Sequence, residues 1–478
     1  MKVIKFGGSS IGTVERFNKV IKIVSKKQEK EKVIVVLSAI GGITDRLINA
    51  VDLARAGKKE YRDVFEEIGL VHYMFLDKLV SKWKQAHARL VISTILSQLD
   101  EKLRGVFLLK ECSPRTSDSI ISTGEYLSKS ILAAALNSGG ITAESLDAAD
   151  FIKTDSNFGE AEVDFNTTNE LIKTKFEGIK QGVIPVVNGF AGSNSAGEIT
   201  TLGRSGSDYT ATIIAGALNA DAVEIWTDVD GVLSADPKIV PEASTLSELS
   251  YEEASELAYL GAKVIFPKAM APVENAGIPI IVLNTFQPEH PGTFIGKTFD
   301  DGGGGVKAVT YLQELSLVCL NEISAEYNLI VISRLFALLA RLELPVILLN
   351  QSASNQSICF VTLSKQISVL LNEIKKEFKL ELETGRAGRI TFRNDVTVVS
   401  AVGKRFDSHS ALLRLVFETL DNNGIKSLMF LNSSTHKNVS FVIERPDAKR
   451  TVAALHGAFF QNSAPVNEEH IKEEKEGI

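Results

Sequence analysis

The stretch KFGGSSIGTVERF, residues 5–17, decides how this chain starts to fold. It continues a short β-branched run, VIKF at residues 3–6, and leads through glycines and serines into an amphipathic segment. Glycine lets backbone N–H groups come close to an anion, and a helix beginning near Thr13 directs the positive end of its dipole the same way. The pattern predicts an anion site, with a plain turn as the alternative. The groups available to such a site are Lys5, Gly7, Gly8 and Ser9.

Further apolar runs alternate with amphipathic segments over the first 300 residues. These runs are VIVVLSA (33–39), GVIPVVNGF (182–190), AVEIWTDVDG (222–231) and IPIIVLN (278–284). Continuous β-branched runs are typical of strands buried on both faces, and helices between them indicate parallel crossovers. We therefore expect an α/β domain of three layers, helix-sheet-helix. Helical patterns cover residues 119–136 and 251–264, and Ser250 with Glu253 forms the pattern of a capping box.

The bulk composition points to a soluble chain that binds small molecules. The chain has 478 residues, 44% of them hydrophobic, and a formal net charge of −7. This balance argues against nucleic acid or anionic lipid as the main partner. Apolar residues 329–350 are interrupted by charges, so we expect no membrane span, no export signal and a cytoplasmic location. The three cysteines (Cys112, Cys319 and Cys359) are scattered, which predicts no disulfide framework and a reducing compartment.

The last third of the chain has a different organisation. FDDGGGGVKAV, residues 299–309, has the composition of a flexible linker. Beyond it, strand-helix-strand-strand-helix patterns occur twice, which indicates two duplicated α+β units of the β-α-β-β-α-β type. The expected divisions are a domain at 1–298, a linker at 299–306, units at 307–392 and 393–465, and a charged tail at 466–478.

Three more motifs carry charged groups near predicted strand or helix ends. In TTLGRSGSDYTATIIAGAL, residues 200–218, Arg204 can grip a carboxylate through two N–H groups, and Asp208 lies near a helix start. The alternative is that Asp208 caps this helix and Arg204 makes a surface pair. IWTDVDGVLSADPK, residues 225–238, lacks the ligands of a calcium loop, and GAKV follows at 261–264. The seven histidines show no metal-ligand spacing, so we expect no metal site in the chain itself.

Taken in chain order, these motifs resemble aspartate kinases of the amino-acid kinase family. The matching motifs are KFGGSS, VVLSA with GIT (35–44), GE (124–125), TTLGR with GSDYTA, WTDVDG with DP, and ELAYLGAKV. The resemblance covers essentially the whole chain, because family members carry two C-terminal ACT domains. It implies that ATP, with Mg²⁺, phosphorylates the β-carboxylate of L-aspartate to 4-phospho-L-aspartate. That reaction is the first step of lysine, threonine and methionine biosynthesis.

The resemblance also implies roles for individual residues. The catalytic residues are Lys5, on the transferred phosphoryl group, and Asp208. The aspartate site comprises Ser38, Thr44, Glu125 and Arg204, with Arg204 on the α-carboxylate and Glu125 near the α-amino group. The nucleotide site comprises Lys5, Gly7, Gly8, Ser9, Thr227, Asp228, Lys238, Lys263 and Val264. The chain departs from the family pattern at Ser205 (usually glycine), Phe266 (usually histidine) and Leu233 (often tyrosine).

The regulatory half is similar to that of threonine-sensitive bifunctional aspartokinase-homoserine dehydrogenases, and no dehydrogenase fingerprint follows. Gln351 matches a polar residue that contacts threonine in those enzymes, and Asn432 holds the equivalent place in the second unit. A threonine or lysine effector and a homodimer or larger assembly through the ACT units are implied. The usual glycine at the first ACT helix is absent, so a loss of feedback is an open alternative.

Two other functions compete with the leading one. A catalytically weak or dead kinase could serve as an ACT amino-acid sensor, since Ser205 and Phe266 are unusual. A sibling kinase acting on another carboxylate or a carbamate is the third possibility, although two ACT units would be odd there.

Overall fold

The computed structural model describes residues 1–262, 265–297, 305–321, 323, 328–352, 357–385, 389–403, 409–432 and 437–460. Contacts divide the chain into two compact units. The first contains Met1–Val232, Thr245–Ser255 and residues 265–297; the second contains Leu233–Ser244, residues 256–262 and the described residues from 305 onward. The second unit thus includes two segments that lie in sequence among those of the first.

The first unit is built on an eight-stranded sheet with the order β3-β4-β2-β1-β7-β9-β10-β8. Neighbouring strands are parallel except for β9 and β10, which are antiparallel. The strands are β1 (Lys2–Phe6), β2 (Val33–Leu37), β3 (Ala143–Leu146), β4 (Ile184–Asn188), β7 (Ala222–Thr227), β8 (Glu248–Ser250), β9 (Ile280–Asn284) and β10 (Thr293–Gly296). A separate hairpin joins β5 (Ala191–Ser193) and β6 (Ile199–Thr201).

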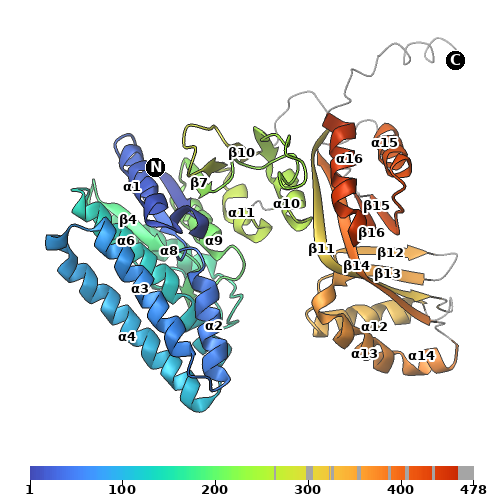
Figure 1. Ribbon diagram of the computed structural model, residues 1–478, viewed down its shortest axis with the longest axis horizontal. Helices are drawn as coiled ribbons and strands as arrows, with labels where there is room; N and C mark the ends of the chain where they lie inside the picture. The colour runs from blue at the N-terminus through green and yellow to red at the C-terminus, as the bar shows by residue number, and fades with distance from the viewer. Residues whose placement is uncertain are drawn as a thin grey trace, which may run out of the picture. The chain divides into compact units, whose positions relative to one another are not determined.

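Helices cover both faces of this sheet, which confirms the three-layer prediction (Figure 1). On one face, Ile4 and Phe6 of β1 share a core with the apolar sides of several helices. The helices on this side are α1 (Val14–Gln28), α2 (Ile43–Arg55), α3 (Tyr61–Leu79), α4 (Gln85–Leu109), α5 (Pro114–Ile121) and α6 (Thr123–Ser138). On the other, α9 (Gly206–Leu218) packs on β1 and β7, while α8 (Phe165–Glu177) and α11 (Pro267–Glu274) pack on α9. The short α7 (Ala148–Phe151) contacts β5 and α8.

Local capping signals place two helix starts as predicted. The Thr13 hydroxyl accepts a hydrogen bond from the Arg16 backbone N–H at the start of α1. At α10 (Tyr251–Tyr259), the Ser250 N–H donates to Glu253 Oε2 and the Glu253 N–H donates to Ser250 Oγ, at 2.8 and 3.1 Å. The predicted single helix over 119–136 is instead two helices, α5 and α6, which meet at Ser122.

The second unit is one antiparallel six-stranded sheet with the order β12-β13-β11-β14-β16-β15. The strands are β11 (Val306–Asn321), β12 (Leu348–Ser352), β13 (Ser357–Leu363), β14 (Arg389–Gly403), β15 (Met429–Asn432) and β16 (Asn438–Glu444). The helices are α12 (Asn328–Arg341), α13 (Ile367–Glu377), α14 (Lys379–Glu383), α15 (His409–Asn422) and α16 (Ala448–Phe460). Helices α12 and α13 share one core with β11 and β13, and α15 and α16 share another with β14 and β16. Two copies of one α+β unit are therefore present, as the repeated pattern predicted.

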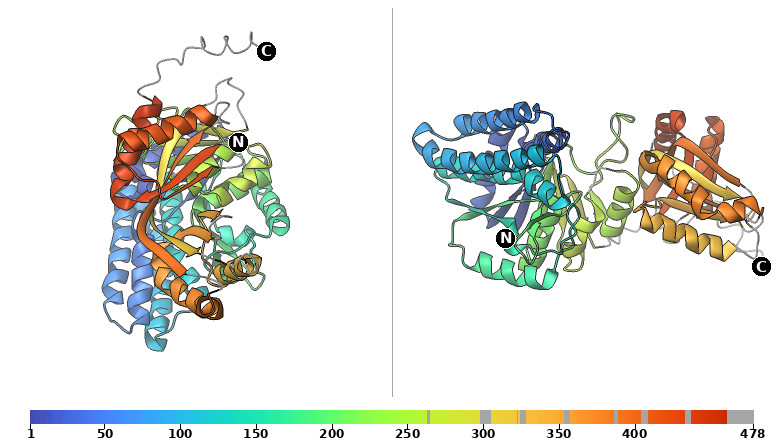
Figure 2. Two further views of the ribbon diagram at one scale, coloured as in Figure 1. Left: turned by 90° about the vertical axis from the view of Figure 1, so that its right-hand side faces the viewer. Right: turned by 90° about the horizontal axis from the view of Figure 1, so that it is seen from below.

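The two copies are fused through their longest strands, which lie side by side (Figures 1 and 2). The second half of β11 pairs with β13, and the second half of β14 pairs with β16. Along their whole length β11 and β14 also pair with each other, with register shifts near Leu315. Glu314 and Asp395 adopt positive φ values of 61° and 57° there, which marks the irregular position in each strand between its two halves.

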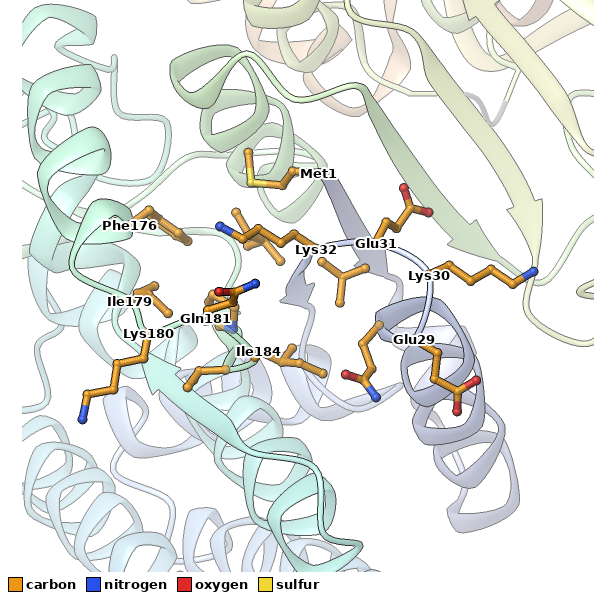
Figure 3. Close-up of a pocket in the computed structure, with 16 residues that line it drawn as sticks. Met1, Glu29, Lys30, Glu31, Lys32, Phe176, Ile179, Lys180, Gln181 and Ile184 are labelled. Carbon is orange, nitrogen blue, oxygen red and sulfur yellow. The ribbon is translucent and has the colours of Figure 1, made fainter.

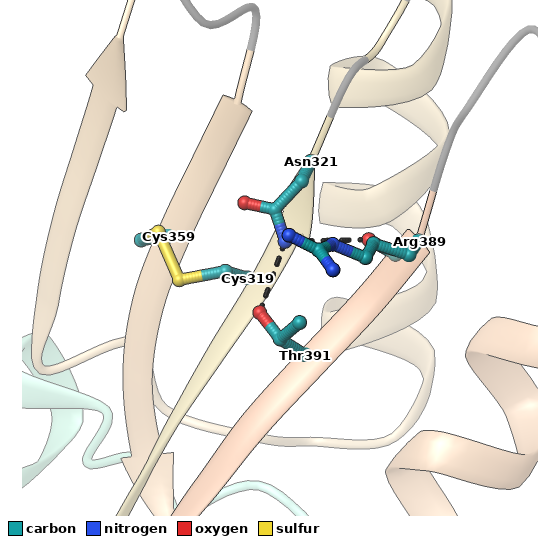
Figure 4. Close-up of a disulfide and its surroundings, with 5 residues drawn as sticks. All are labelled: Cys319, Asn321, Cys359, Arg389 and Thr391. Atoms are coloured by element: carbon teal, nitrogen blue, oxygen red, sulfur yellow. Dashed lines mark hydrogen bonds between the residues drawn. A yellow bond between two sulfur atoms is a disulfide. The ribbon is translucent and has the colours of Figure 1, made fainter.

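The expectation that the scattered cysteines do not pair is wrong for Cys319 and Cys359. Cys319 of β11 and Cys359 of β13 lie opposite each other in the register and form a disulfide (Figure 4). A neighbouring polar contact, from the Asn321 side-chain amide to Thr391 Oγ1 at 2.9 Å, joins β11 to β14. Strand pairing brings together two cysteines 40 positions apart, which their spacing along the chain does not reveal.

Among the described residues, no helix is both long and apolar enough to cross a bilayer. Gly302, Gly303 and Gly304 of the glycine run, and the tail at 466–478, lie outside the described residues.

Candidate active site

Four neighbouring strands of the first sheet end at the same edge. Phe6 of β1 is in register with Leu37 of β2 and Trp226 of β7, and Leu37 is in register with Asn188 of β4. The chains stay together as they leave the sheet, because the Gly7 N–H donates to Trp226 O at 3.1 Å. Open α/β sheets bind ligands outside the carboxyl ends of such strands. Of the predicted site residues, Lys5, Ser38 and Thr227 lie at this edge, where β1, β2 and β7 end.

Lys5 and Asp208, which are far apart in sequence, form an ion pair of 2.5 Å. Lys5 comes from β1 and Asp208 from the first turn of α9, and both residues are buried. Asp208 does not cap α9, since Ser205 holds the N-cap position. A buried ammonium needs a partner charge, and Asp208 supplies that charge and fixes Lys5 at the strand end.

The glycine-rich loop after β1 lies against the loop after β2. A Cβ on Gly8 would lie 2.9 Å from the carbonyl oxygen of Ala39, so only glycine fits there. Ser10 fixes the far end of the loop: its hydroxyl donates to Trp226 O at 3.1 Å and lies 2.7 Å from Thr285 Oγ1. Arg16 Nη1 donates to Ser9 O at 2.9 Å. The loop is therefore held by its neighbours at the edge where Lys5 ends.

Glu125 places a buried carboxylate beside these loops. It belongs to the first turn of α6 and is 4% exposed. Its Oε1 accepts a hydrogen bond from the Ala39 N–H at 3.1 Å, while its Oε2 has no hydrogen-bond partner among the described residues. Burial raises the pKa of Glu125 to about 8, although the Ala39 hydrogen bond and the positive charge of Lys5 act in the opposite direction. A buried acceptor without a partner is costly, so Oε2 is suited to receive a ligand's donor.

Close packing fixes the position of Glu125. A Cβ on Gly124 would lie 2.7 Å from the Ala39 Cβ, so α6 approaches the loop after β2 more closely than another residue would allow. Ser128 Oγ, one turn further along, donates to Ser38 O at 2.7 Å. Ser38 itself donates its N–H to Phe6 O at 3.2 Å. The predicted substrate residues Ser38 and Glu125 are thus joined in one network.

Arg204 lies in the loop before α9, between two residues with left-handed backbone. Gly203 has φ 75° and Ser205 has φ 56°. The conformation at 205 favours glycine, which explains why the family pattern has glycine there. Arg204 is exposed, and its guanidinium lies over the ring of Phe266, 5.7 Å from the centroid.

The other predicted residues are less closely connected. Thr44 is half-buried in the first turn of α2, and Thr227 Oγ1 donates to Asp228 Oδ1 at 3.2 Å where β7 ends. Lys238 is exposed in the 233–244 segment of the second unit. Lys263 and Val264 lie outside the described residues. Gln351 and Asn432 are exposed near the ends of β12 and β15.

Asp118 is a buried carboxylate that sequence reasoning missed. Its oxygens accept hydrogen bonds from the N–H groups of Gly159 and Thr201, both at 2.8 Å, and from Thr201 Oγ1 at 2.9 Å. Burial raises the pKa of Asp118, and these three hydrogen bonds act against the shift. It ties α5 to β6, just before the Arg204 loop. A lone aspartate within an apolar helical pattern, SDSII, was the only available signal.

The pocket shown in Figure 3 is separate from this site. It is lined by residues 28–34, 179–185, Met1 and Phe176, and so lies at the amino ends of β1, β2 and β4. Lys5, Glu125 and Asp208 do not line it.

Comparisons with known proteins show which families the two parts of the chain resemble. A family model described as the amino acid kinase family matches residues 1–284, and one described as an ACT domain matches residues 399–459. Aspartokinase 1, chloroplastic, of Arabidopsis thaliana is 30% identical over 481 residues, which cover 96% of this chain and 80% of that protein. A bifunctional aspartokinase/homoserine dehydrogenase of Buchnera aphidicola is 29% identical over 474 residues, 98% of this chain. The chain spans 57% of the length of that relative.

Solved structures give the same result for the fold. The structure of E. coli aspartokinase III in complex with aspartate and ADP matches with a TM-score of 0.82 at 26% identity, covering 96% of this chain and 100% of that one. The same enzyme in complex with lysine and aspartate matches with a TM-score of 0.76. With a family model over residues 1–284 and these relatives along nearly its whole length, the chain belongs to the amino acid kinase family.

Proposed function

We propose that this chain is an aspartate kinase, which transfers the γ-phosphoryl group of ATP to the β-carboxylate of L-aspartate. The observation that carries the proposal is the grouping of Lys5, Asp208 and Glu125 at one sheet edge, where Glu125 Oε2 has no hydrogen-bond partner within the described part of the chain. The similarity to aspartokinases along nearly the whole chain supports it.

The arrangement suits phosphoryl transfer to an acceptor that is already ionised. A carboxylate acceptor with an ordinary pKa of about 4 needs no general base at neutral pH. The protein has to hold the two reactants in line and balance the charge on the transferred group. In this proposal Lys5 supplies that positive charge, and the N–H groups of Gly7, Gly8 and Ser9 hold the phosphates. Mg²⁺ bound to the ATP phosphates would supply further positive charge for the transferred group.

The acceptor is held by two charged groups of opposite sign. Arg204 receives the α-carboxylate, because its exposed guanidinium can donate two parallel hydrogen bonds. Glu125 receives the α-ammonium through its free Oε2. Binding an ammonium there favours the ionised form of Glu125 and offsets the cost of burying it.

The first test is ATP-dependent formation of an acyl hydroxamate in hydroxylamine, with aspartate, glutamate and N-acetylglutamate as acceptors. We expect product from aspartate alone. Lys5→Met should lose turnover and keep the wild-type circular dichroism spectrum, while Lys26→Met, at an exposed position on α1, serves as the control. Product from another acceptor, or a near-wild-type rate in Lys5→Met, would contradict the proposal.

Regulation is proposed on the same basis. The ACT units would bind a small amino acid, threonine or lysine, near Gln351 and Asn432, and join two copies of the chain. Adding each amino acid to the hydroxamate assay distinguishes the two effectors.

We also propose that the domains extend over residues 1–298, 307–392 and 393–465 and that the protein is cytoplasmic.

A further inference from the structure

Phe266, the residue that precedes α11, lies under the guanidinium of Arg204. The guanidinium carbon is 5.7 Å from the ring centroid, within the range of a cation–π contact. Phe266 is also one of the positions where the chain departs from the family pattern. We therefore ask what its contact with Arg204 does for the site.

The ring of Phe266 is carried by a firmly packed element. Phe266 is the N-cap of α11, and Pro267 follows at the first helical position. Helix α11 packs closely on α9, since a Cβ on Gly216 of α9 would lie 2.8 Å from Pro272 O. A second cation–π contact, of Lys268 Nζ over the Tyr209 ring at 5.8 Å, joins the same two helix starts.

Arg204, by contrast, has few restraints of its own. Within the described part of the chain, its side chain makes no hydrogen bond or ion pair, and the Phe266 ring is its recorded partner. An exposed arginine has many rotamers, and ordering it for a ligand costs conformational entropy. A ring that contacts the guanidinium reduces this cost, and a contact with the ring leaves the N–H groups of Arg204 without a competing acceptor.

We propose that Phe266 is a positioning residue that holds Arg204 ready for the α-carboxylate of the acceptor. The proposal deepens the aspartate kinase assignment and rests on it for the identity of the ligand. Phe266 touches Arg204 rather than substrate, so its effect falls on acceptor binding. For a contact of this kind at an exposed site, we expect an effect of about two- to five-fold.

The kinetic test compares Phe266→Leu, which removes the aromatic face, with Phe266→Tyr, which keeps it. Phe266→Leu should raise KM for aspartate about two- to five-fold and leave kcat and KM for ATP unchanged. Phe266→Tyr should restore the wild-type KM. Lys268→Met, which removes the neighbouring contact with Tyr209, is the matched control and should leave KM for aspartate unchanged. An unchanged KM in Phe266→Leu, or an equal rise in both KM values, would overturn the proposal.

A second measurement does not depend on activity. Phenylglyoxal modifies accessible guanidinium groups, and its rate at Arg204 can be followed by peptide mass spectrometry in the full chain without substrates. Removing the ring should speed modification at Arg204 in Phe266→Leu, with wild-type rates in Phe266→Tyr and Lys268→Met. Equal rates in all four proteins would refute a restraint of Arg204 by the Phe266 ring. If the wild type phosphorylates no aspartate, the assigned function fails, and the labelling still decides the position of Arg204.

Discussion

Replacing Glu125 by glutamine should stabilise the chain and weaken its binding of aspartate. An acid whose pKa is raised from 4.5 to about 8 holds a proton in the folded state that the unfolded chain releases between these pH values. The protonated Glu125 therefore contributes to the free energy of unfolding in full below pH 4.5. This contribution is lost as pH rises toward 8, so the free energy of unfolding falls with pH. At 1.36 kcal/mol per pH unit, the loss is about 3 kcal/mol at pH 7.

Glutamine carries no charge and keeps an oxygen that can accept the Ala39 N–H. The Glu125→Gln protein should therefore have a higher free energy of unfolding than the wild type, by up to about 3 kcal/mol at pH 7 and by much less at pH 5. Urea unfolding at pH 5, 6, 7 and 8 measures this difference. Both tryptophans, Trp83 and buried Trp226, belong to the first unit, so their fluorescence reports on it. Glu101→Gln, at an exposed position on α4, is the control and should follow the wild type.

The same carboxyl group predicts a proton linked to aspartate binding. With a pKa of about 8 the free protein holds most of one proton at Glu125 at pH 7, and an ammonium bound to Oε2 displaces it. Titration calorimetry in phosphate and in Tris buffer should show release of about one proton per aspartate in the wild type and none in Glu125→Gln. Parallel unfolding curves for the two proteins at every pH, or a wild type that releases no proton, would refute the reasoning.

Three other predictions concern single features. Burial lowers the pKa of His72 to about 4, so protonation of this side chain opposes folding below pH 6.5. Between pH 7 and pH 5 the free energy of unfolding of the wild type should therefore fall by about 2 kcal/mol through His72. Urea unfolding at the two pH values should show that His72→Leu lacks this fall. Ser205 has a left-handed backbone with φ 56°, which costs energy for any residue other than glycine. Ser205→Gly should therefore raise the free energy of unfolding by about 1 kcal/mol and raise the melting temperature in thermal melts. A lower melting temperature would contradict this prediction. The disulfide closes a loop of 40 residues, so reduction or Cys359→Ser should destabilise the second unit by about 2–4 kcal/mol, measured by hydrogen exchange at β13 with and without dithiothreitol. Unchanged exchange would mean that the sheet alone holds the two strands.

The sequence by itself determined the local elements and the positions of the motifs. The strand over residues 3–6, which the structure extends to Lys2, and the capping box at Ser250 follow from patterns among near neighbours, which local physics controls. The sequence also predicted that the second unit contains two copies of one α+β unit, because the same order of strand and helix patterns occurs twice. The position of the glycine-rich loop after β1 was also predicted from residue types alone.

Only the tertiary structure decided which distant groups meet. The pairing of Lys5 with Asp208, the free oxygen of Glu125 and the contact of Arg204 with Phe266 depend on how α6, α9 and α11 pack around one sheet edge. The Cys319–Cys359 disulfide depends on the register between two strands in the same way. Burial and pairing between remote segments are set by the packing of the whole unit, and no pattern of near neighbours along the chain contains that information.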